Sequence, residues 1–525
     1  MTTTTGDARS IGLGAQGLPI ERLADILRQR VAATPTKVAL RENSGDTSFA
    51  ELDARSSQFA QALLAAGVKA GDRVAMVCAN DRYFVEFMFG ATKMGAIPAP
   101  INLRLVPAEL RGVLSVCEPT LLYVGAGCEA LMPAPGDIPG LQTLLDTAGY
   151  EKLIAGHSTD DPGYQAGASE CQLIQFSSGT TGQPKGIMLS GRNFSAALTG
   201  VADRVDIDEN AIAMAPVPFF HITGLVLALT AINKGSILLL KMPAGPADLI
   251  RLLVEEGVTH AVGVPTLIQM ISQSPAAKDA DWSKLKYFVY GGAPMPRPAI
   301  TAATEVLECG LIQGYGMTET TAGVTTLWPE DHLPQPGRDR VVGSVGRPMD
   351  GVEIRIVDPA TGRVVQTDER GEVQIRGPWV TQGYFNRPEE TAAALVGDGW
   401  LRTGDGGSLD ADGYLYLHDR IKDMIVSGGE NVYPAEIESV LSAHPDIAEV
   451  GVIGIPSHKW GESPHAVVVP KPGSHPTEVD IIAWSRENMA HFKCPVSVSF
   501  VGALPRNPSG KILKRALREG VAELP

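Results

Sequence analysis

The sequence predicts an α/β protein with a large N-terminal domain of mixed, mainly parallel sheets flanked by helices, plus a small β unit. A small C-terminal α+β domain follows. The chain has 525 residues, more than a single compact core usually serves. Its first half alternates strand and helix patterns, which is typical of parallel sheets. After about residue 340, short alternating strands bounded by Gly and Asp indicate an antiparallel unit.

The first expected helix lies within residues 47–67. Ser48 and Glu51 have the spacing of a capping box, and apolar residues then recur on one helical face. A buried strand at 73–80, a helix pattern and a second strand at 96–102 follow, and this order predicts a βαβ unit. The same alternation returns in residues 234–240, 247–257, 258–265 and 286–292.

The second half contains two groups of strands. The expected antiparallel unit has strands at 351–358, 371–377 and 413–420, and DADG at 410–413 predicts a hairpin turn. The last hundred residues combine strand and helix patterns again, which indicates a separate α+β domain. We expect the domains to be 1–421 and 422–525. In the last domain, strands are expected at 447–456, 465–470 and 496–502, and helices at 434–444 and 478–489.

Composition limits the classes of function. Apolar residues make up 44% of the chain and charged residues 20%, as in an ordinary globular protein. The net charge of −15 argues against nucleic acid as the main partner. None of the six cysteines has zinc-ligand spacing, so reduced thiols in the cytoplasm are expected. No signal peptide or transmembrane segment is expected, because the apolar stretch 222–232 is too short to span a bilayer.

Residues 177–186, SSGTTGQPKG, have the composition of a phosphate-binding loop. A Walker loop is excluded, because Pro184 takes the place of its second glycine and Gly186 that of its hydroxyl residue. Hydroxyl and backbone N–H groups could still surround a polyphosphate. A surface turn is the alternative, and composition alone favours it.

Six further segments carry groups that suit a nucleotide site. Two are Gly turns at expected strand ends, where α/β sheets bind ligands. One places a single histidine in an apolar, aromatic run, and the others carry an acid, basic residues or a lysine on turns. They are PVPFFHITGL (216–225), YGGAPMP (290–296), QGYGMTET (313–320), WLRTGD (400–405), residues 418–438 and LPRNPSGKILKR (504–515).

Taken together, these segments resemble the adenylate-forming superfamily, which includes acyl-CoA synthetases, aryl-CoA ligases, luciferase and adenylation domains of peptide synthetases. The resemblance covers nearly the whole chain, with the segments in the family's order. It implies two half-reactions: a carboxylate attacks the α-phosphate of MgATP to give acyl-AMP and pyrophosphate, and a thiol then releases AMP. ATP and CoA would be co-substrates, and Mg²⁺ the cofactor.

The resemblance also implies roles for individual residues at the nucleotide. Thr180 and Glu319 would hold Mg²⁺. Asp405 and Arg420 would bind the ribose hydroxyls, although Asp405 also suits a plain turn. The β- and γ-phosphates would be held by Ser177, Ser178, Gly179, Thr180, Thr181 and Lys185. Adenine and the α-phosphate would contact Gly291, Gly292, Ala293, Gln313, Gly314, Tyr315, Gly316 and Thr318.

Catalysis is expected from Lys511, His221 and Glu319. By resemblance, Lys511 bridges the attacking carboxylate and the nucleotide as a positioned charge. A lone histidine among aromatic residues is usually a core residue, but the resemblance places His221 at the acyl pocket. Lys422 would be the hinge on which the small domain swings between half-reactions. The acyl pocket would include Phe220, His221, Gly292, Gly316 and Met317, and the CoA tunnel Ser427, Gly428 and Gly429.

We therefore expect an AMP-forming acyl-CoA synthetase for a hydrophobic fatty or aromatic monocarboxylic acid. The alternative is a free-standing acyl-AMP ligase that loads a separate carrier protein. An amino-acid adenylation module is disfavoured, because FFHITG lacks the Asp that would pair with an α-amino group. A luciferase-like oxygenase and a binding protein with an inactive site rank lower. Chain length of the acid and a homo-oligomeric state stay open.

Overall fold

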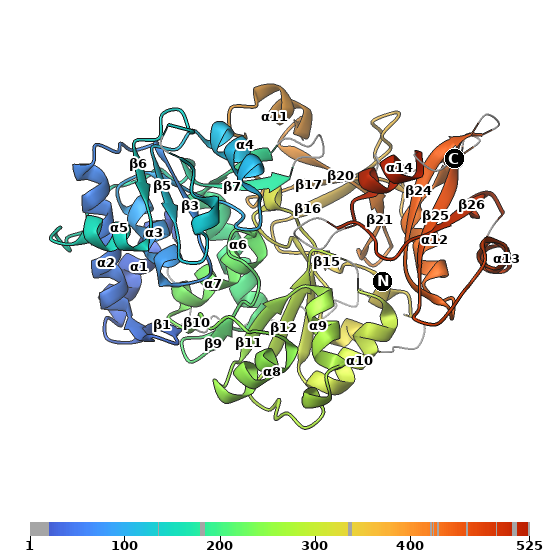
Figure 1. Cartoon of the computed structure of the whole chain (residues 1–525), viewed down its shortest axis with the longest axis horizontal. Coiled ribbons are helices and arrows are strands. Elements are labelled where there is room, and N and C mark those ends of the chain that lie inside the picture. The colour runs from blue at the N-terminus through green and yellow to red at the C-terminus, as the bar shows by residue number, and fades with distance from the viewer. Residues whose placement is uncertain are drawn as a thin grey trace, which may run out of the picture. The chain divides into compact units, whose positions relative to one another are not determined.

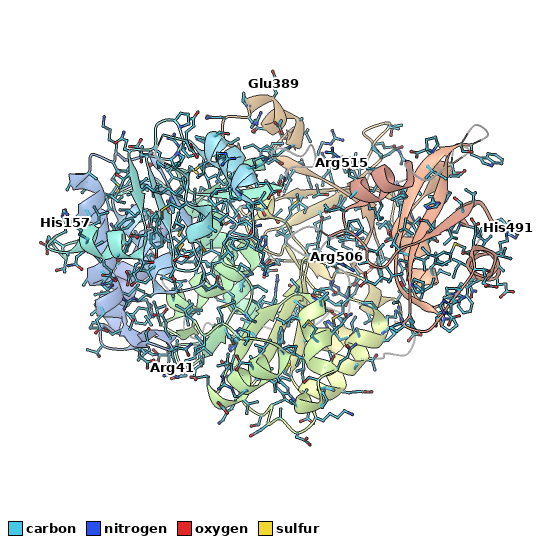
Figure 2. The ribbon with its side chains drawn as sticks, in the orientation of Figure 1. Arg41, His157, Glu389, His491, Arg506 and Arg515 are labelled. Atoms are coloured by element: carbon cyan, nitrogen blue, oxygen red, sulfur yellow. The ribbon has the colours of Figure 1, made fainter. Side chains whose placement is uncertain are left out.

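The computed structural model divides into two compact units (Figure 1). The first runs to Ile312 and adds Gly316–Val324 and Pro378–Pro388; the second comprises Gln313–Tyr315, Thr325–Gly377 and the chain from Glu389 onward. Figure 2 shows the side chains of the described residues. The structure describes residues 20–134, 136–178, 184–293, 295–333, 339–420, 423, 425–427, 430–457, 460–489, 491–506 and 512–522.

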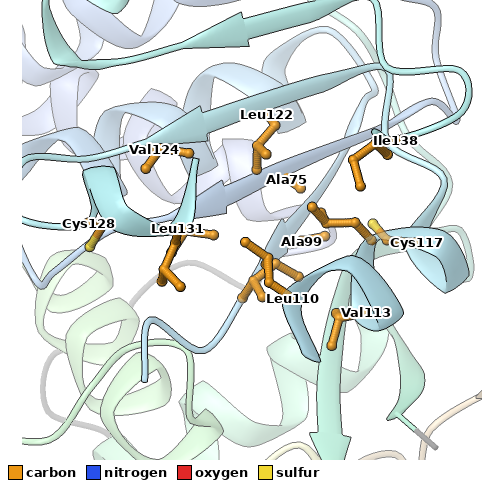
Figure 3. Packing of buried hydrophobic residues seen from close by; sticks show 13 residues of the cluster. Ala75, Ala99, Leu110, Val113, Cys117, Leu122, Val124, Cys128, Leu131 and Ile138 are labelled. Atoms are coloured by element: carbon orange, nitrogen blue, oxygen red, sulfur yellow. The ribbon is translucent and has the colours of Figure 1, made fainter. Parts of the chain in front are cut away.

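The first unit contains a four-stranded parallel sheet, ordered β4 (Ile97–Pro100), β3 (Arg73–Val77), β5 (Leu121–Val124) and β6 (Thr143–Leu145). Helix α3 (Arg82–Lys93) joins β3 to β4, which confirms the predicted βαβ unit. The two prolines of β4 lie on an edge strand, where a missing N–H donor is tolerated. Figure 3 shows apolar side chains of this sheet packed against α4 (Pro107–Cys117).

The helix α2 (Phe49–Ala65) begins where the sequence predicts. The Glu51 N–H donates to Ser48 Oγ over 3.2 Å, and the Ser48 N–H donates to Glu51 Oε2 over 2.8 Å, so the capping box is confirmed. Around it lie α1 (Leu23–Ala33) and α5 (Thr147–Ile154).

A seven-stranded sheet is ordered β13 (Gly310–Gly314), β12 (Tyr287–Gly291), β11 (His260–Gly263), β9 (Ile212–Met214), β10 (Ile237–Leu239), β1 (Val38–Glu42) and β2 (Gly45–Ser48). The pairs β12–β11, β11–β9, β9–β10 and β10–β1 are parallel, and β1–β2 is antiparallel. The apolar stretch near residue 222 forms the largely buried helix α7 (Ile222–Lys234). The other helices of this part are α6 (Gly191–Val205), α8 (Pro246–Glu255), α9 (Pro265–Ser272) and α10 (Arg297–Leu307).

A third sheet of the first unit has three antiparallel strands, ordered β18 (Gly383–Tyr384), β8 (Pro184–Ser190) and β7 (Cys171–Ser178). The sequence predicted a small antiparallel β unit after about residue 340, within the N-terminal domain. Residues 378–388 instead return to the first unit and complete this sheet. A two-residue strand has no periodicity from which this pairing could be predicted.

The second unit contains the expected antiparallel β structure: β16 (Glu353–Val357), β17 (Gly371–Arg376), β19 (Leu395–Val396), β20 (Trp400–Leu409) and β21 (Leu415–Arg420). The Gly413 N–H donates to Asp410 O over 3.1 Å, which confirms the hairpin turn. Two further strands pair, β14 (Thr325–Thr326) and β15 (Arg347–Pro348). Helix α11 (Pro388–Ala394) precedes β19.

The C-terminal part of this unit is the predicted α+β structure with its own apolar core. The domain boundary between residues 421 and 422 stays a prediction. In the described residues, no helix is long and apolar enough to cross a membrane. The elements are β22 (Ile425–Ser427), β23 (Glu430–Val432), α12 (Pro434–Leu441), β24 (Ile447–Ser457), β25 (Gly461–Pro470), α13 (Glu478–Asn488), β26 (Ser497–Phe500) and α14 (Lys514–Ala522).

Candidate active site

The predicted phosphate loop connects the two strands of a hairpin. Ser177 on β7 lies opposite Lys185 on β8. A strand and not a helix therefore follows the loop, in agreement with the exclusion of a Walker loop. The loop residues Gly179, Thr180 and Thr181 lie outside the described residues, as does the side chain of Ser178.

A cation, an aromatic ring and an acid meet beside this hairpin. The Nζ of Lys185 lies 4.8 Å from the centroid of the Tyr384 ring. The Tyr384 hydroxyl donates a hydrogen bond to Glu319 Oε1 over 3.1 Å. Tyr384 is 9% exposed and Glu319 8% exposed. The structure thus brings together Lys185 and Glu319, two of the predicted residues, through one that was not predicted.

The segment around Glu319 is fixed by its own sequence. A Cβ on Gly316 would lie 2.0 Å from Ala322 O, so only glycine fits there. The short helix η3 (Thr318–Thr320) follows, and Thr320 Oγ1 accepts from the Met317 N–H over 2.9 Å. The Thr381 N–H donates to Glu319 O over 2.8 Å. Gly316, Met317, Thr318 and Glu319 are therefore parts of one turn.

His221 and Phe220 lie at the start of α7, where His221 is the N-cap residue. Their rings are in contact, with centroids 4.6 Å apart. Gln175 on β7 donates to the Phe220 carbonyl. Asn80 donates to Val217 O over 2.8 Å and accepts from the Phe219 N–H over 2.8 Å. Two buried amides thus hold the histidine segment, and sequence reasoning did not identify either of them.

The predicted adenine turn follows strand β12. Gly291 ends that strand, and Gly292 has φ +80°, a conformation that favours glycine. A Cβ at Gly292 would meet nothing within 4 Å, so the requirement is for backbone conformation and not for space. Gly292 and Ala293 are exposed, so a flat ring could reach this backbone.

A second set of predicted residues meets in the second unit. The Tyr315 hydroxyl donates to Asp405 Oδ2 over 2.7 Å. Asp405 lies opposite Arg420 in the pairing of β20 with β21, which brings the two predicted ribose ligands to neighbouring backbone positions. Gln313 pairs through its backbone with Leu327, and Gly314 ends β13. The side chain of Arg420 lies outside the described residues.

Close to Arg420, β21 also carries a half-buried histidine. Burial lowers the pKa of His418 to about 4, and the Arg370 charge adds to this effect while Glu436 opposes it. The His418 imidazole is therefore neutral at physiological pH, and it adds no charge beside Arg420.

Several predicted residues lie outside the described part of the chain, and their roles stay predictions. They are Gly179, Thr180, Thr181, Lys422, Gly428, Gly429 and Lys511. Ser427 is described and ends β22. Within the described residues, no group of three or more His, Cys, Asp or Glu side chains could hold a metal ion.

Comparisons with known proteins identify the family of this chain. The model of the AMP-binding enzyme family matches residues 27–385, and that of the AMP-binding enzyme C-terminal domain matches residues 436–511. The chain therefore belongs to the AMP-binding enzyme family, and the resemblance to adenylate-forming enzymes is confirmed. Within this family it is an AMP-forming acyl-CoA ligase.

Individual relatives extend over nearly the whole chain. The long-chain-fatty-acid–CoA ligase FadD13 of Mycobacterium tuberculosis H37Rv is 37% identical over 94% of this chain and 97% of its own. The fatty acid–[acyl-carrier-protein] ligase ScoC of Streptomyces coeruleorubidus is 35% identical over 92% and 93%. ATP-bound MatB from Rhodopseudomonas palustris superposes with a TM-score of 0.88 at 29% identity, over 96% and 99%.

Proposed function

We propose that this ligase activates a hydrophobic fatty or aromatic monocarboxylic acid with MgATP and transfers the acyl group to CoA. The observation that supports this most is the set of Lys185, Tyr384 and Glu319 beside the β7–β8 hairpin. A cation and a buried carboxylate at one place suit a ligand that carries both phosphates and a divalent metal ion.

In the first half-reaction, a carboxylate oxygen of the acid attacks the α-phosphorus of ATP. The bond from this phosphorus to pyrophosphate breaks, and acyl-AMP forms. Two anions must approach each other in this step, so positive charge near the phosphates lowers the barrier. Lys185 supplies one such charge, and Ser177, opposite it in the hairpin, supplies a hydroxyl donor. Lys511 would supply a second charge at the attacking carboxylate.

Glu319 is the described residue that fits Mg²⁺. Mg²⁺ is commonly bound by one or two carboxylates together with substrate phosphates. Glu319 provides one such carboxylate, and its side chain is buried. Thr180 would add a hydroxyl ligand. The ion would neutralise charge on the phosphate oxygens.

Asp405 suits the ribose of the nucleotide. A carboxylate accepts hydrogen bonds from two neighbouring hydroxyls, and the Tyr315 hydroxyl orients it over 2.7 Å. Arg420, its partner across the β20–β21 pairing, would donate to the same sugar. Gly292 and Ala293 would lie against adenine.

In the second half-reaction, the sulfur of CoA attacks the acyl carbon, and the bond from this carbon to the AMP oxygen breaks. His221 and Phe220 would line the acyl pocket at this carbon. We expect the small domain to swing at Lys422 between the steps, which would remove Lys511 and bring Ser427, Gly428 and Gly429 to the thiol.

The six cysteines are free thiols, which supports a cytoplasmic location.

The segment after His221 supports an apolar acid as the substrate. Helix α7 begins with small or apolar residues, most of them buried. No Arg or Lys occurs in residues 221–229 or 316–323 to hold a second carboxylate. The fatty-acid names of two relatives agree with this class.

The test is incubation of the purified protein with MgATP and a panel of fatty, aryl and amino acids, each with and without CoA, followed by mass spectrometry. Acyl-CoA formation supports the proposal, and the best acid defines the class. Preference for an acid with a second carboxylate or an α-amino group would contradict the assignment of the pocket.

Transfer to a carrier protein is the second candidate, because ScoC is nearly as similar to this chain as FadD13 is. Accumulation of acyl-AMP in the presence of CoA would favour this alternative. Addition of a phosphopantetheinylated carrier protein to the same mixture then tests it directly.

A further inference from the structure

We propose that Tyr384 is a positioning residue, which holds Lys185 and Glu319 in the arrangement that binds MgATP. This role rests on the function proposed above. Sequence reasoning assigned no role to Tyr384. It acts through the two charged side chains that it contacts.

The backbone places the Tyr384 ring under the Lys185 ammonium. In the pairing of β18 with β8, Tyr384 lies opposite Ile187. Side chains alternate along a strand, so Lys185, two residues before Ile187, projects from the same face. The Phe385 N–H donates to Gly186 O over 2.8 Å and fixes this register. The ammonium lies 4.8 Å from the ring centroid, within the range of a cation–π interaction.

The hydroxyl of Tyr384 has a separate task. It donates to Glu319 Oε1 over 3.1 Å at a place where both side chains are buried. Hydrogen bonds from neighbouring groups orient metal-binding carboxylates, and their loss weakens metal binding. The Thr381 N–H binds the Glu319 carbonyl, so the same short segment holds both the backbone and the side chain of the acid.

One neutral side chain therefore orients a cation with its ring face and an anion with its hydroxyl. Because tyrosine is uncharged at neutral pH, it fixes both groups without changing the net charge that meets the phosphates. The two tasks reside in different atoms, so substitutions can separate them. Tyr384→Phe removes the hydroxyl alone, and Tyr384→Leu removes the hydroxyl and the aromatic face.

Tyr83 offers a matched control in the same unit. Its hydroxyl donates to Glu151 Oε1 over 2.8 Å, and the Arg82 guanidinium lies 4.9 Å from its ring centroid. Tyr83 thus makes the same pair of interactions away from the candidate site. Tyr83→Phe therefore measures how the loss of a comparable hydroxyl elsewhere in the unit affects ATP and Mg²⁺ binding.

The experiment is calorimetric titration of the full chain with ATP, in EDTA and across a series of Mg²⁺ concentrations. For Tyr384→Phe we expect the Mg²⁺ concentration at half-saturation to rise roughly tenfold. Its ATP affinity in EDTA should stay that of the wild type. For Tyr384→Leu we expect ATP affinity in EDTA to fall roughly two- to fivefold as well, because Lys185 loses the ring. Tyr83→Phe should match the wild type in both conditions.

Three results would overturn this role. A wild-type Mg²⁺ requirement in Tyr384→Phe would show that the hydroxyl does not position Glu319. Equal losses of ATP affinity with and without Mg²⁺ in that variant would indicate a general structural role. Both of these results leave the proposed function standing. Failure of the wild-type protein to bind ATP in either condition would refute the proposed function, and this role with it.

Discussion

Replacing Asp81 with Asn should stabilise the first unit in a pH-dependent way. Asp81 is the N-cap of α3, and its Oδ1 accepts from the Phe84 N–H over 3.0 Å. Burial raises the pKa of this carboxyl to about 6; the capping N–H opposes the rise, and the charges of Glu42 and Glu86 add to it. An acid that holds its proton more tightly in the native than in the unfolded state destabilises the native state once it ionises. The protonated Asp81 carboxyl therefore contributes its full stabilisation of the native state at low pH. This contribution is lost as the pH rises through about 6.

The size of the effect follows from the pKa. Each unit of pKa difference between the native and unfolded states corresponds to about 1.36 kcal/mol. The pKa of Asp81 rises from 3.8 to about 6, so its ionisation lowers the free energy of unfolding by roughly 3 kcal/mol. The amide of Asn stays neutral and can still accept the capping hydrogen bond. The free energy of unfolding of Asp81→Asn should exceed that of the wild type by up to about 3 kcal/mol near pH 8. Near pH 5 this difference should be smaller by about 1.5 kcal/mol.

Urea denaturation at both pH values measures this difference. The control is Asp146→Asn, because Asp146 caps α5 at an exposed position and accepts from the Gly149 N–H over 2.6 Å. This control gives the effect of exchanging a capping carboxylate for an amide. The reasoning would be refuted if Asp81→Asn were no more stable than the wild type near pH 8, or if its gain were the same at both pH values.

Three further changes test other parts of the structure. Arg55→Met should lower the free energy of unfolding by up to about 3–5 kcal/mol, because the fully buried Glu86 carboxylate loses its two-point partner and keeps only the Arg82 guanidinium at 3.9 Å and the Tyr150 hydroxyl at 3.3 Å. Denaturation that shows full recovery in Arg55→Met/Glu86→Met confirms the cause, and a loss below about 1 kcal/mol contradicts it. Tyr315→Phe should raise the KM for ATP roughly three- to tenfold with little change in kcat, because the Asp405 carboxylate loses the hydroxyl that orients it. A fall in kcat with an unchanged KM would argue against a contact between Asp405 and the ribose. Gly316→Ala should lower adenylation at least tenfold, since its Cβ would overlap a main-chain oxygen 2.0 Å away; steady-state kinetics at wild-type levels would show that this turn is not required.

Local signals predicted much of the fold. The capping box at Ser48 predicted the start of α2, and the strands β4, β24 and β26 lie within a few residues of their expected ranges. These elements carry their signal in adjacent residues, as periodicity or as a turn. The strand expected at 73–80 ends earlier, at Val77, because the next residues lead into the cap of α3.

The site was only partly accessible to sequence reasoning. The resemblance of short motifs to a known family predicted roles for Lys185, Glu319 and Asp405. The structure brings Lys185 and Glu319 together, and the roles stay predictions. Contacts between distant segments could not be predicted in this way. Tyr384 follows a glycine in a segment without periodicity, and nothing nearby in the sequence indicates that its hydroxyl reaches Glu319. The amide of Asn80, which holds the His221 segment, is missed for the same reason.

The return of residues 378–388 to the first unit has a consequence for synthesis on the ribosome. Strands β7 and β8 emerge early, but their third partner, β18, is about 200 residues further along the chain. At a translation rate of about 5–20 residues per second, this strand follows roughly 10–40 s later. During that interval one edge of the β7–β8 hairpin has no partner strand. Unpaired strand edges make folding intermediates prone to aggregation, which chaperones counteract. A fragment cut before residue 378 would keep the hairpin permanently in this incomplete form.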